Sequence, residues 1–225
     1  MDKRLLFVLV LLAGCETTST STSSSPASSA AAKPNTTPAP TAAPATAAKR
    51  DKLEGIPLVW KPTTNVATLG AVDLTGLTNV KVQVARLSDK RDAPGLIGEN
   101  REKQPPRKVT TPDDVPVFVT DHMKSLMKGA GVSVVDSGGT TMIKGEILQF
   151  FVVETDTYKG DVRIHFSVTN AAGKVMWNAV VGGSSTRFGR SYKDENYYET
   201  LSDSLIDATY NLLKTPGFHD ALLRK

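Results

Sequence analysis

The chain has 225 residues, of which 40% are hydrophobic and 22% are charged. This length supplies one hydrophobic core of ordinary size, and a net charge of +4 is too small to indicate nucleic acid as a partner. Cys15 is the only cysteine, which excludes an internal disulfide and leaves the chain without the sulfur ligands of a structural zinc site.

The first fourteen residues have the three parts of a secretory signal peptide. Lys3 and Arg4 supply a positive start, residues 5–12 form an unbroken apolar run, and two small residues precede Cys15. The run is far shorter than the roughly 20 residues that a membrane-spanning helix needs. A short buried helix is the alternative, but a long polar tract follows. We therefore expect residues 1–14 to be removed, which leaves a net charge of +3.

Leu12-Ala13-Gly14-Cys15 resembles the lipobox of bacterial lipoproteins. The resemblance implies a diacylglyceryl thioether on Cys15, cleavage before it, and acylation of the new amino terminus, with palmitate as the expected chain. Two or three acyl chains, at about 0.8 kcal/mol per buried methylene, anchor a protein stably. In the lipoproteins that this lipobox resembles, an aspartate after the cysteine favours retention in the inner membrane, and a glutamate such as Glu16 is a poorer signal. The resemblance therefore implies the outer membrane, with the protein facing the periplasm.

Residues 15–52 are expected to form a disordered tether that starts at the lipidated cysteine. From residue 17 to residue 50 the chain is almost wholly Ser, Thr, Ala and Pro, which cannot bury enough apolar surface to offset the entropy lost on ordering. Such a tether spans roughly 30 Å as a random coil and up to about 100 Å as a polyproline-like chain. One interpretation is a plain spacer that keeps the domain off the lipid surface. The other is a tether long enough to bring the domain to the cell wall or to an inner-membrane partner.

The folded domain is expected over residues 53–225. Residues 53–79 hold short apolar pieces broken by proline and glycine, which indicates an irregular leader with at most one edge strand, and Trp60 is expected to pack on the sheet. Residues 80–87 alternate as a half-buried strand does. Residues 88–111 are expected to form a charged turn and then a long exposed loop.

A helix is predicted to begin after Asp113-Asp114, because acidic residues suit the positive end of a helix. Pro116 is tolerated only in the first turn, and Gly129 or Gly131 ends the helix. Apolar residues recur at intervals of three and four and give one apolar face. These residues are Val115, Phe118, Val119, His122, Met123, Leu126 and Met127.

Several antiparallel strands and a last helix follow. The strands are predicted at residues 132–135, 142–153, 162–169 and 174–181, with a hairpin turn at 170–173. Gly182 to Ser185 is expected to open a loop. Asp194 or Asn196 caps the last helix, Pro216-Gly217 ends it, and the tail adds one more turn. The fold class is α+β: an antiparallel meander with two amphipathic helices on one face, in two layers.

The sequence contains no recognisable catalytic or metal-binding arrangement. Spacing does not bring His122, His165 and His219 together, and the Gly-Gly-Ser stretch lacks the pattern of a serine-nucleophile elbow. Glu154 and Asp156 flank a turn and are expected to be solvated. We therefore predict a protein that is not an enzyme and that has no metal or cofactor.

Two charged stretches are candidates for binding. Residues 88–92 place alternating charges at one end of the sheet, and Arg187, Arg190 and Tyr192 combine arginine with aromatic residues before the last helix. Arginine among aromatic residues is typical of binding hot spots, whereas ordinary solvated loops are the alternative.

The lipobox, the strand that ends in Leu87-Ser-Asp-Lys-Arg91, Gly131, and the meander through Ile143–Ile147 and Gly160–Val162 resemble the YajG-type envelope lipoproteins. The resemblance covers roughly residues 80–213 and implies location and fold, without an established activity. A looser likeness of architecture, without a specific motif, is to the lipoprotein activators of penicillin-binding proteins.

Two functions are consistent with these features. The first is an accessory or assembly factor of the cell envelope, anchored by lipid, that binds another envelope protein. The second is a binding module for peptidoglycan or lipid, and an apolar cavity between the sheet and the helices would favour lipid. A hydrolase is the least favoured class.

Overall fold

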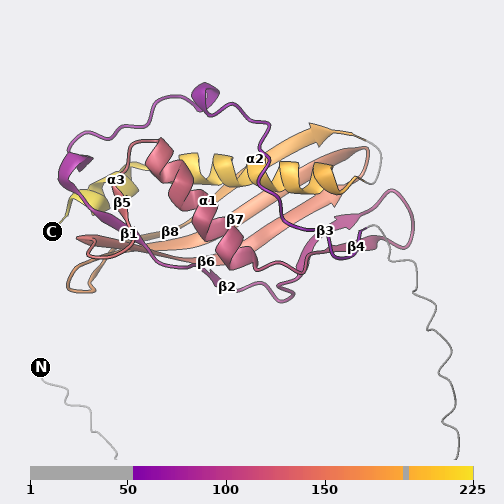
Figure 1. Ribbon diagram of the computed structural model, residues 1–225, viewed down its shortest axis with the longest axis horizontal. Helices are drawn as coiled ribbons and strands as arrows, with labels where there is room; N and C mark the ends of the chain where they lie inside the picture. Colours follow the sequence, from indigo (N-terminus) through magenta and orange to yellow (C-terminus); the bar gives the residue numbers. More distant parts are fainter. Residues whose placement is uncertain (1–52, 190–192, 225) are drawn as a thin grey trace, which may run out of the picture. The chain divides into compact units, whose positions relative to one another are not determined.

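The structure is a computed structural model that describes residues 53–189 and 193–224. Cys15, the predicted signal peptide and the predicted tether lie outside the described residues. The described part is an α+β domain (Figure 1), as predicted. In chain order its elements are η1 (Val66–Leu69), η2 (Leu77–Asn79), β1 (Val82–Val84), β2 (Ser88–Asp89), β3 (Leu96–Asn100), β4 (Arg107–Thr110), α1 (Val115–Gly129), β5 (Val134–Val135), β6 (Thr141–Glu154), β7 (Thr157–Asn170), β8 (Val175–Phe188), α2 (Asp194–Leu213) and α3 (Pro216–Leu223).

Three long antiparallel strands, β6, β7 and β8, form the main part of the sheet. Side chains alternate along them, so that Val162, Ile164 and Phe166 are buried while Arg163 between the first two is exposed. The predicted meander is therefore confirmed, including the turn between β7 and β8.

The sheet is mixed, because the segment before α1 runs parallel to β6 along its free edge. β1, β2 and β3 pair with successive parts of β6, β4 pairs antiparallel with β3, and β5 pairs with β1. The prediction of a long exposed loop up to residue 111 is wrong in part. Ile97 and Val109 are fully buried, because β3 and β4 extend the sheet.

The helices α1 and α2 lie on the same face of the sheet, as predicted (Figure 1). Asp114 caps α1 by accepting a hydrogen bond from the Val117 N–H at 3.0 Å, and Gly131, with φ of 100°, turns the chain after the helix. The prediction that Asp194 or Asn196 caps α2 is wrong, because the N-cap position is Lys193, whose side chain makes no capping hydrogen bond. The predicted extra turn at the carboxyl end is the helix α3, which begins at Pro216.

Two glycines in the strands allow α2 to approach the sheet closely. A Cβ atom on Gly183 would lie 2.0 Å from the backbone nitrogen of Ala208, and one on Gly160 would lie 2.3 Å from the Ser204 hydroxyl. The predicted loop at residues 182–185 is therefore wrong. This segment is the middle of β8, and its glycines match the small side chains of α2.

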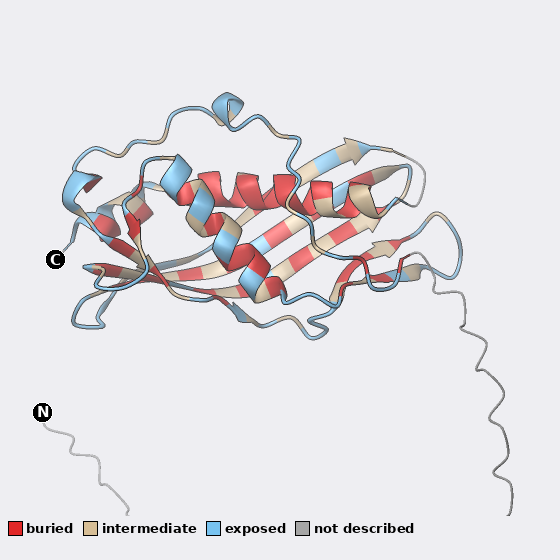
Figure 2. Cartoon of the chain, in the orientation of Figure 1, coloured by how far each residue is buried: buried red, intermediate tan, exposed pale blue. Residues whose placement is uncertain are grey.

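A strap of residues 53–80 crosses α2 on the side away from the sheet (Figure 1). Because the strap covers one side of α2 and the sheet covers the other, most residues of α2 are buried (Figure 2). Three hydrogen bonds of 2.6–2.8 Å run from Thr63 and Thr64 to the Asp203 carboxylate. Trp60 stacks on His122 of α1 at 4.2 Å between ring centroids, so the prediction that it packs on the sheet is wrong.

Candidate functional site

A buried carboxylate, Glu154, lies at the end of β6. Its two oxygens accept hydrogen bonds from the hydroxyls of Tyr158 on β7 and Tyr197 on α2. All three side chains are fully buried, and the two rings meet edge to face at 5.2 Å. The prediction that Glu154 is solvated is therefore wrong.

The surroundings of this cluster hold both phenols protonated. Burial raises the pKa of Tyr197 and of Tyr158, and the adjacent Glu154 carboxylate raises both further. Protonated phenols are the donors that a buried carboxylate needs. Since the cluster joins β6, β7 and α2, we assign it to the cohesion of this end of the domain.

Arg187, one of the three predicted binding residues, points toward α2. Its guanidinium pairs with the buried carboxylate of Glu199, which also lies 3.0 Å from the Lys61 ammonium of the strap. Arg190 and Tyr192 lie outside the described residues, so the prediction of a binding loop stays a prediction. The structure gives Arg187 a second role, which is to fasten the end of β8.

Phe188 follows Arg187 and points to the opposite face of the sheet. It is 81% exposed, the highest value among the large hydrophobic side chains of the described residues. The register of β6, β7 and β8 places Phe151 and Val153 on the same face at the same end, with Lys159 and Asp161 of β7 between them and β8. We call Phe151, Val153 and Phe188 the β8-end patch.

The face of the sheet that carries this patch is opposite to the helices (Figure 1). Charged side chains lie across its middle, among them Lys144, Glu146 and Arg163, and the His165 ring lies 3.4 Å from Glu146. Val180, which pairs with His165 and is 56% exposed, also lies in the middle of this face. Exposed aromatic residues set among polar ones are typical of contact surfaces.

The edge of β8 is partly protected. The Ser184 N–H donates to Asp207 of α2 at 2.9 Å, and the Asn211 side-chain amide donates to the Gly182 carbonyl at 3.0 Å. These two bonds occupy backbone groups in the middle of the edge, where a further strand would otherwise pair. Neither bond involves the end of β8 around Phe188, so the two bonds do not prevent a partner from contacting that end.

The three histidines lie apart, as predicted. His122 packs between Trp60 and Phe118, His165 lies on the uncovered face, and His219 contacts the Thr75 carbonyl at 2.9 Å. Within residues 53–189 and 193–224, no group of three or more histidine, cysteine, aspartate or glutamate side chains is placed to hold a metal ion.

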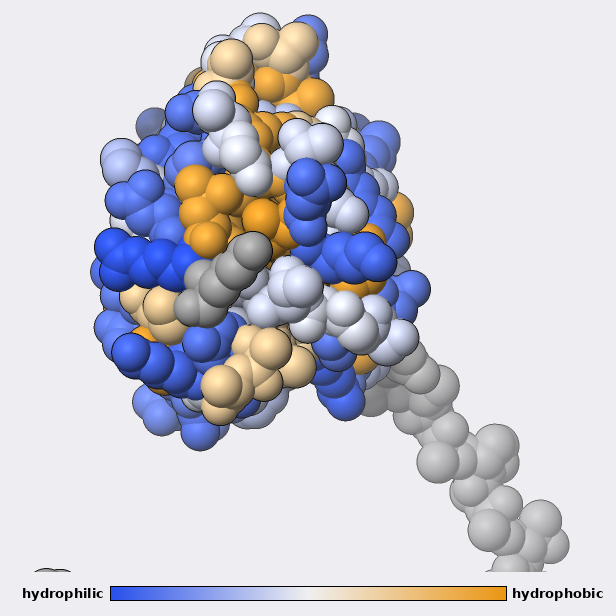
Figure 3. All heavy atoms as spheres, turned by 90° about the vertical axis from the view of Figure 1, so that its left-hand side faces the viewer, coloured by the Kyte–Doolittle hydropathy of each residue, from blue (hydrophilic) through white to orange (hydrophobic). Residues whose placement is uncertain are grey.

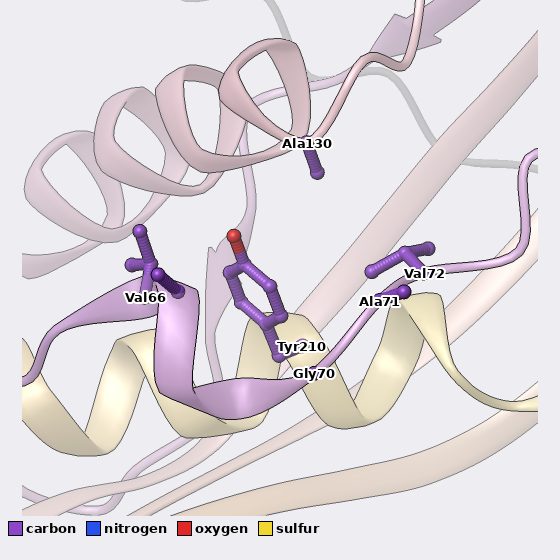
Figure 4. A pocket seen from close by; sticks show the side chains of 7 residues that line it. Val66, Gly70, Ala71, Val72, Ala130 and Tyr210 are labelled. Carbon is purple, nitrogen blue, oxygen red and sulfur yellow. The ribbon is translucent and has the colours of Figure 1, made fainter.

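A small apolar pocket of about 330 Å³ lies between the strap and the helices. Val66 and Val72 of the strap and Ala130 line it, and Tyr210 of α2 points its hydroxyl toward the space between them (Figure 4). A single phenol gives this pocket little with which to orient a ligand, so we interpret it as a gap in the packing of the strap.

No protein-family model and no curated protein matches the sequence. Among solved structures, the chain is similar to a DUF330-family protein from Xanthomonas campestris, with 9% identity, a TM-score of 0.48, and coverage of 64% of this chain and 88% of that one. It is also similar to a protein from Caulobacter crescentus described provisionally as a lipoprotein, with 8% identity, a TM-score of 0.45, and coverage of 72% and 100%. For a minor lipoprotein from Acinetobacter baumannii the values are 9%, 0.35, 61% and 94%.

These likenesses are too weak to carry an argument about function, and the resemblance to the YajG-type lipoproteins stays a prediction. Among the helices of the described residues, none combines the length and the apolar character that crossing a membrane requires.

Proposed function

We propose that this protein is a non-enzymatic lipoprotein of the cell envelope, anchored through Cys15 at the outer membrane, whose domain binds another envelope protein through the β8-end patch. The lipobox-like sequence before Cys15 supports the anchor. The exposure of Phe188 at the end of a rigid strand carries the proposal for the contact.

A large exposed aromatic side chain is costly in water and valuable in an interface. Aromatic residues are enriched in protein interfaces, and a few of them supply most of the binding energy. Phe151 and Val153 add apolar surface at the same end of this face, across β7 from Phe188. The predicted neighbours Arg190 and Tyr192 follow within four residues of Phe188, and their residue types suit the rim of the same contact.

The strand end is positioned before any partner arrives. Arg187 points inward to Glu199, which is nearly fully buried, so the backbone that presents Phe188 outward is tied to α2. A contact residue on a fixed strand loses less conformational entropy on binding than one on a free loop.

Site-specific crosslinking in intact cells tests the contact. A photoreactive phenylalanine analogue at position 188 should give one defined adduct with another envelope protein. The matched control is position 117, because Val117 is also exposed, at 40%, but lies on α1 on the other side of the domain. The same set of adducts from both positions, or no protein adduct at position 188, would refute the contact.

Two variants separate the contact from the anchor. Phe188→Asp should remove the partner from co-purification while the protein stays in the membrane fraction, since this side chain contributes little to the core. Cys15→Ser should release the protein from the membrane, and its persistence there would contradict lipid anchoring.

A further inference from the structure

The end of the domain opposite to the β8-end patch carries an apolar pocket of about 650 Å³. It lies between the end of the strap, the turn after β7 and the helix α3. Its apolar walls come from Val80, Ala171, Ala172, Leu222 and Leu223. Pockets of roughly 300–1,000 Å³ with mainly apolar walls are of the size that binds small molecules.

Hydrophobic side chains gather on this end of the molecule, and hydrophilic ones surround them (Figure 3). Leu222 is nearly fully buried, whereas Leu223 beside it is 40% exposed. An apolar ligand that covers this exposed leucine and the pocket beside it would be stabilised by about 25 cal/mol for each Å² of apolar surface removed from water.

The helix α3 holds one wall of the pocket in place. Phe218 packs edge to face on Trp177 of β8 at 5.6 Å, and the His219 ring bonds to the Thr75 carbonyl of the strap. The close approach of Gly217 to Trp177, where a Cβ atom would lie 3.0 Å from the indole nitrogen, leaves little room for the helix to shift. The pocket is thus formed by packed elements.

Arg224 is the only charged residue among those that line the pocket. It is exposed, and no ion pair between described residues includes it. The other polar groups at the opening are hydroxyls and amides of Asn79, Thr140, Thr141 and Asn170. A ligand that fits this arrangement has an apolar body and an anionic end.

We propose that this pocket binds a single acyl chain that ends in a carboxylate or a phosphate, with the chain between Leu222, Leu223 and Val80 and the anionic group at Arg224. Guanidinium groups pair with both anions through two parallel hydrogen bonds. The site is separate from the β8-end patch, so its failure would leave the proposed protein contact unaffected.

Photolabelling of the full chain tests the site. The protein is purified from envelope membranes, moved from detergent into nanodiscs of phosphatidylcholine, and irradiated with palmitate that carries a diazirine on its chain. Mass spectrometry of the peptides should place the label in residues 76–80 and 217–225. Label confined to the acyl groups at Cys15, or spread evenly over the domain, would overturn the proposal.

Variants at the opening distinguish the apolar part of the site from the charged part. Arg224→Glu should reduce labelling by palmitate at least tenfold and leave labelling by the corresponding uncharged alcohol unchanged. Ala172→Trp, in the exposed turn, should fill the pocket and reduce labelling by both ligands. Arg163→Glu, on the uncovered face of the sheet, is the matched control and should have no effect.

A competition experiment identifies the anionic group. Unlabelled lysophosphatidic acid and unlabelled palmitate are each added in excess, and the stronger competitor shows whether the phosphate or the carboxylate is preferred. Failure of both to compete, or an equal loss of labelling in Arg224→Glu and Arg163→Glu, would refute a specific anionic site.

Discussion

Replacing Tyr158 and Tyr197 with phenylalanine tests whether the buried Glu154 cluster holds this end of the domain together. Each substitution removes one hydroxyl donor from a fully buried carboxylate, and a hydrogen bond to a charged group contributes about 1.5–3 kcal/mol to stability. Both donors act on one carboxylate, so their effects will not be strictly additive. We expect the double variant to be less stable than the natural protein by about 3–5 kcal/mol at pH 7.

The same cluster gives this prediction a pH dependence of known sign. Burial raises the pKa of both phenols in the folded protein, while the unfolded chain ionises them near the ordinary value of about 10. Above that pH the unfolded state binds fewer protons than the folded state, so stability falls as pH rises. At about 1.4 kcal/mol per pH unit for each group, the natural protein should lose about 3 kcal/mol between pH 9 and pH 11 relative to the double variant.

Urea unfolding at several pH values between 7 and 11 measures both effects. The difference in unfolding free energy between the natural protein and the double variant should be largest at pH 7 and should narrow above pH 10. Tyr198→Phe is the control, because this residue of α2 lies outside the cluster. A difference that stays constant up to pH 11 would show that the two phenols ionise equally in both states, and the assignment of the cluster would be refuted.

Three further predictions concern the packing of α2 and α1. Gly183→Ala should lower the free energy of unfolding in urea by about 3 kcal/mol or more, because the added Cβ would lie 2.0 Å from the backbone of Ala208. The control is Gly129→Ala, which has open space around it and should change the free energy of unfolding very little. Asp203→Ala removes the acceptor of three hydrogen bonds from the strap. It should lower the free energy of unfolding by about 2–4 kcal/mol and make the strap sensitive to protease. Protease resistance equal to that of the natural protein would contradict the role of Asp203. Burial lowers the pKa of His122, so as pH falls the unfolded state takes up a proton before the folded state does. The free energy of unfolding should therefore decrease below about pH 6.5. His122→Phe should make this decrease smaller.

The parts of the fold that were predicted correctly depend on local signals. The start of α1 follows from a capping aspartate and a proline in the first turn, and β6 to β8 follow from alternating side chains. β3 and β4 have only five and four residues. β3 joins the sheet by pairing with β6, with Gly98 opposite Val152. A partner more than fifty residues away leaves no periodicity in so short a segment.

The environment of Glu154 was missed for a similar reason, although one signal was available. The alternation along β6 puts Val152 on the buried face, and Glu154 continues the same phase. The strand pattern at Glu154, the last residue before the turn, therefore predicts a buried side chain, and this signal is stronger than the expectation that a charged residue is exposed. The second donor, Tyr197, comes from α2, and its approach depends on tertiary packing that the sequence pattern does not show.

Burial of α2 under the strap also explains why its polar residues do not follow a simple amphipathic pattern. The side chains of Asp203 and Ser202 face the strap and accept hydrogen bonds from it, so polar groups on this side are satisfied without water. Glu199 pairs both with Lys61 of the strap and with Arg187 of β8. One buried carboxylate therefore connects the beginning of the folded domain to the strand end that presents Phe188.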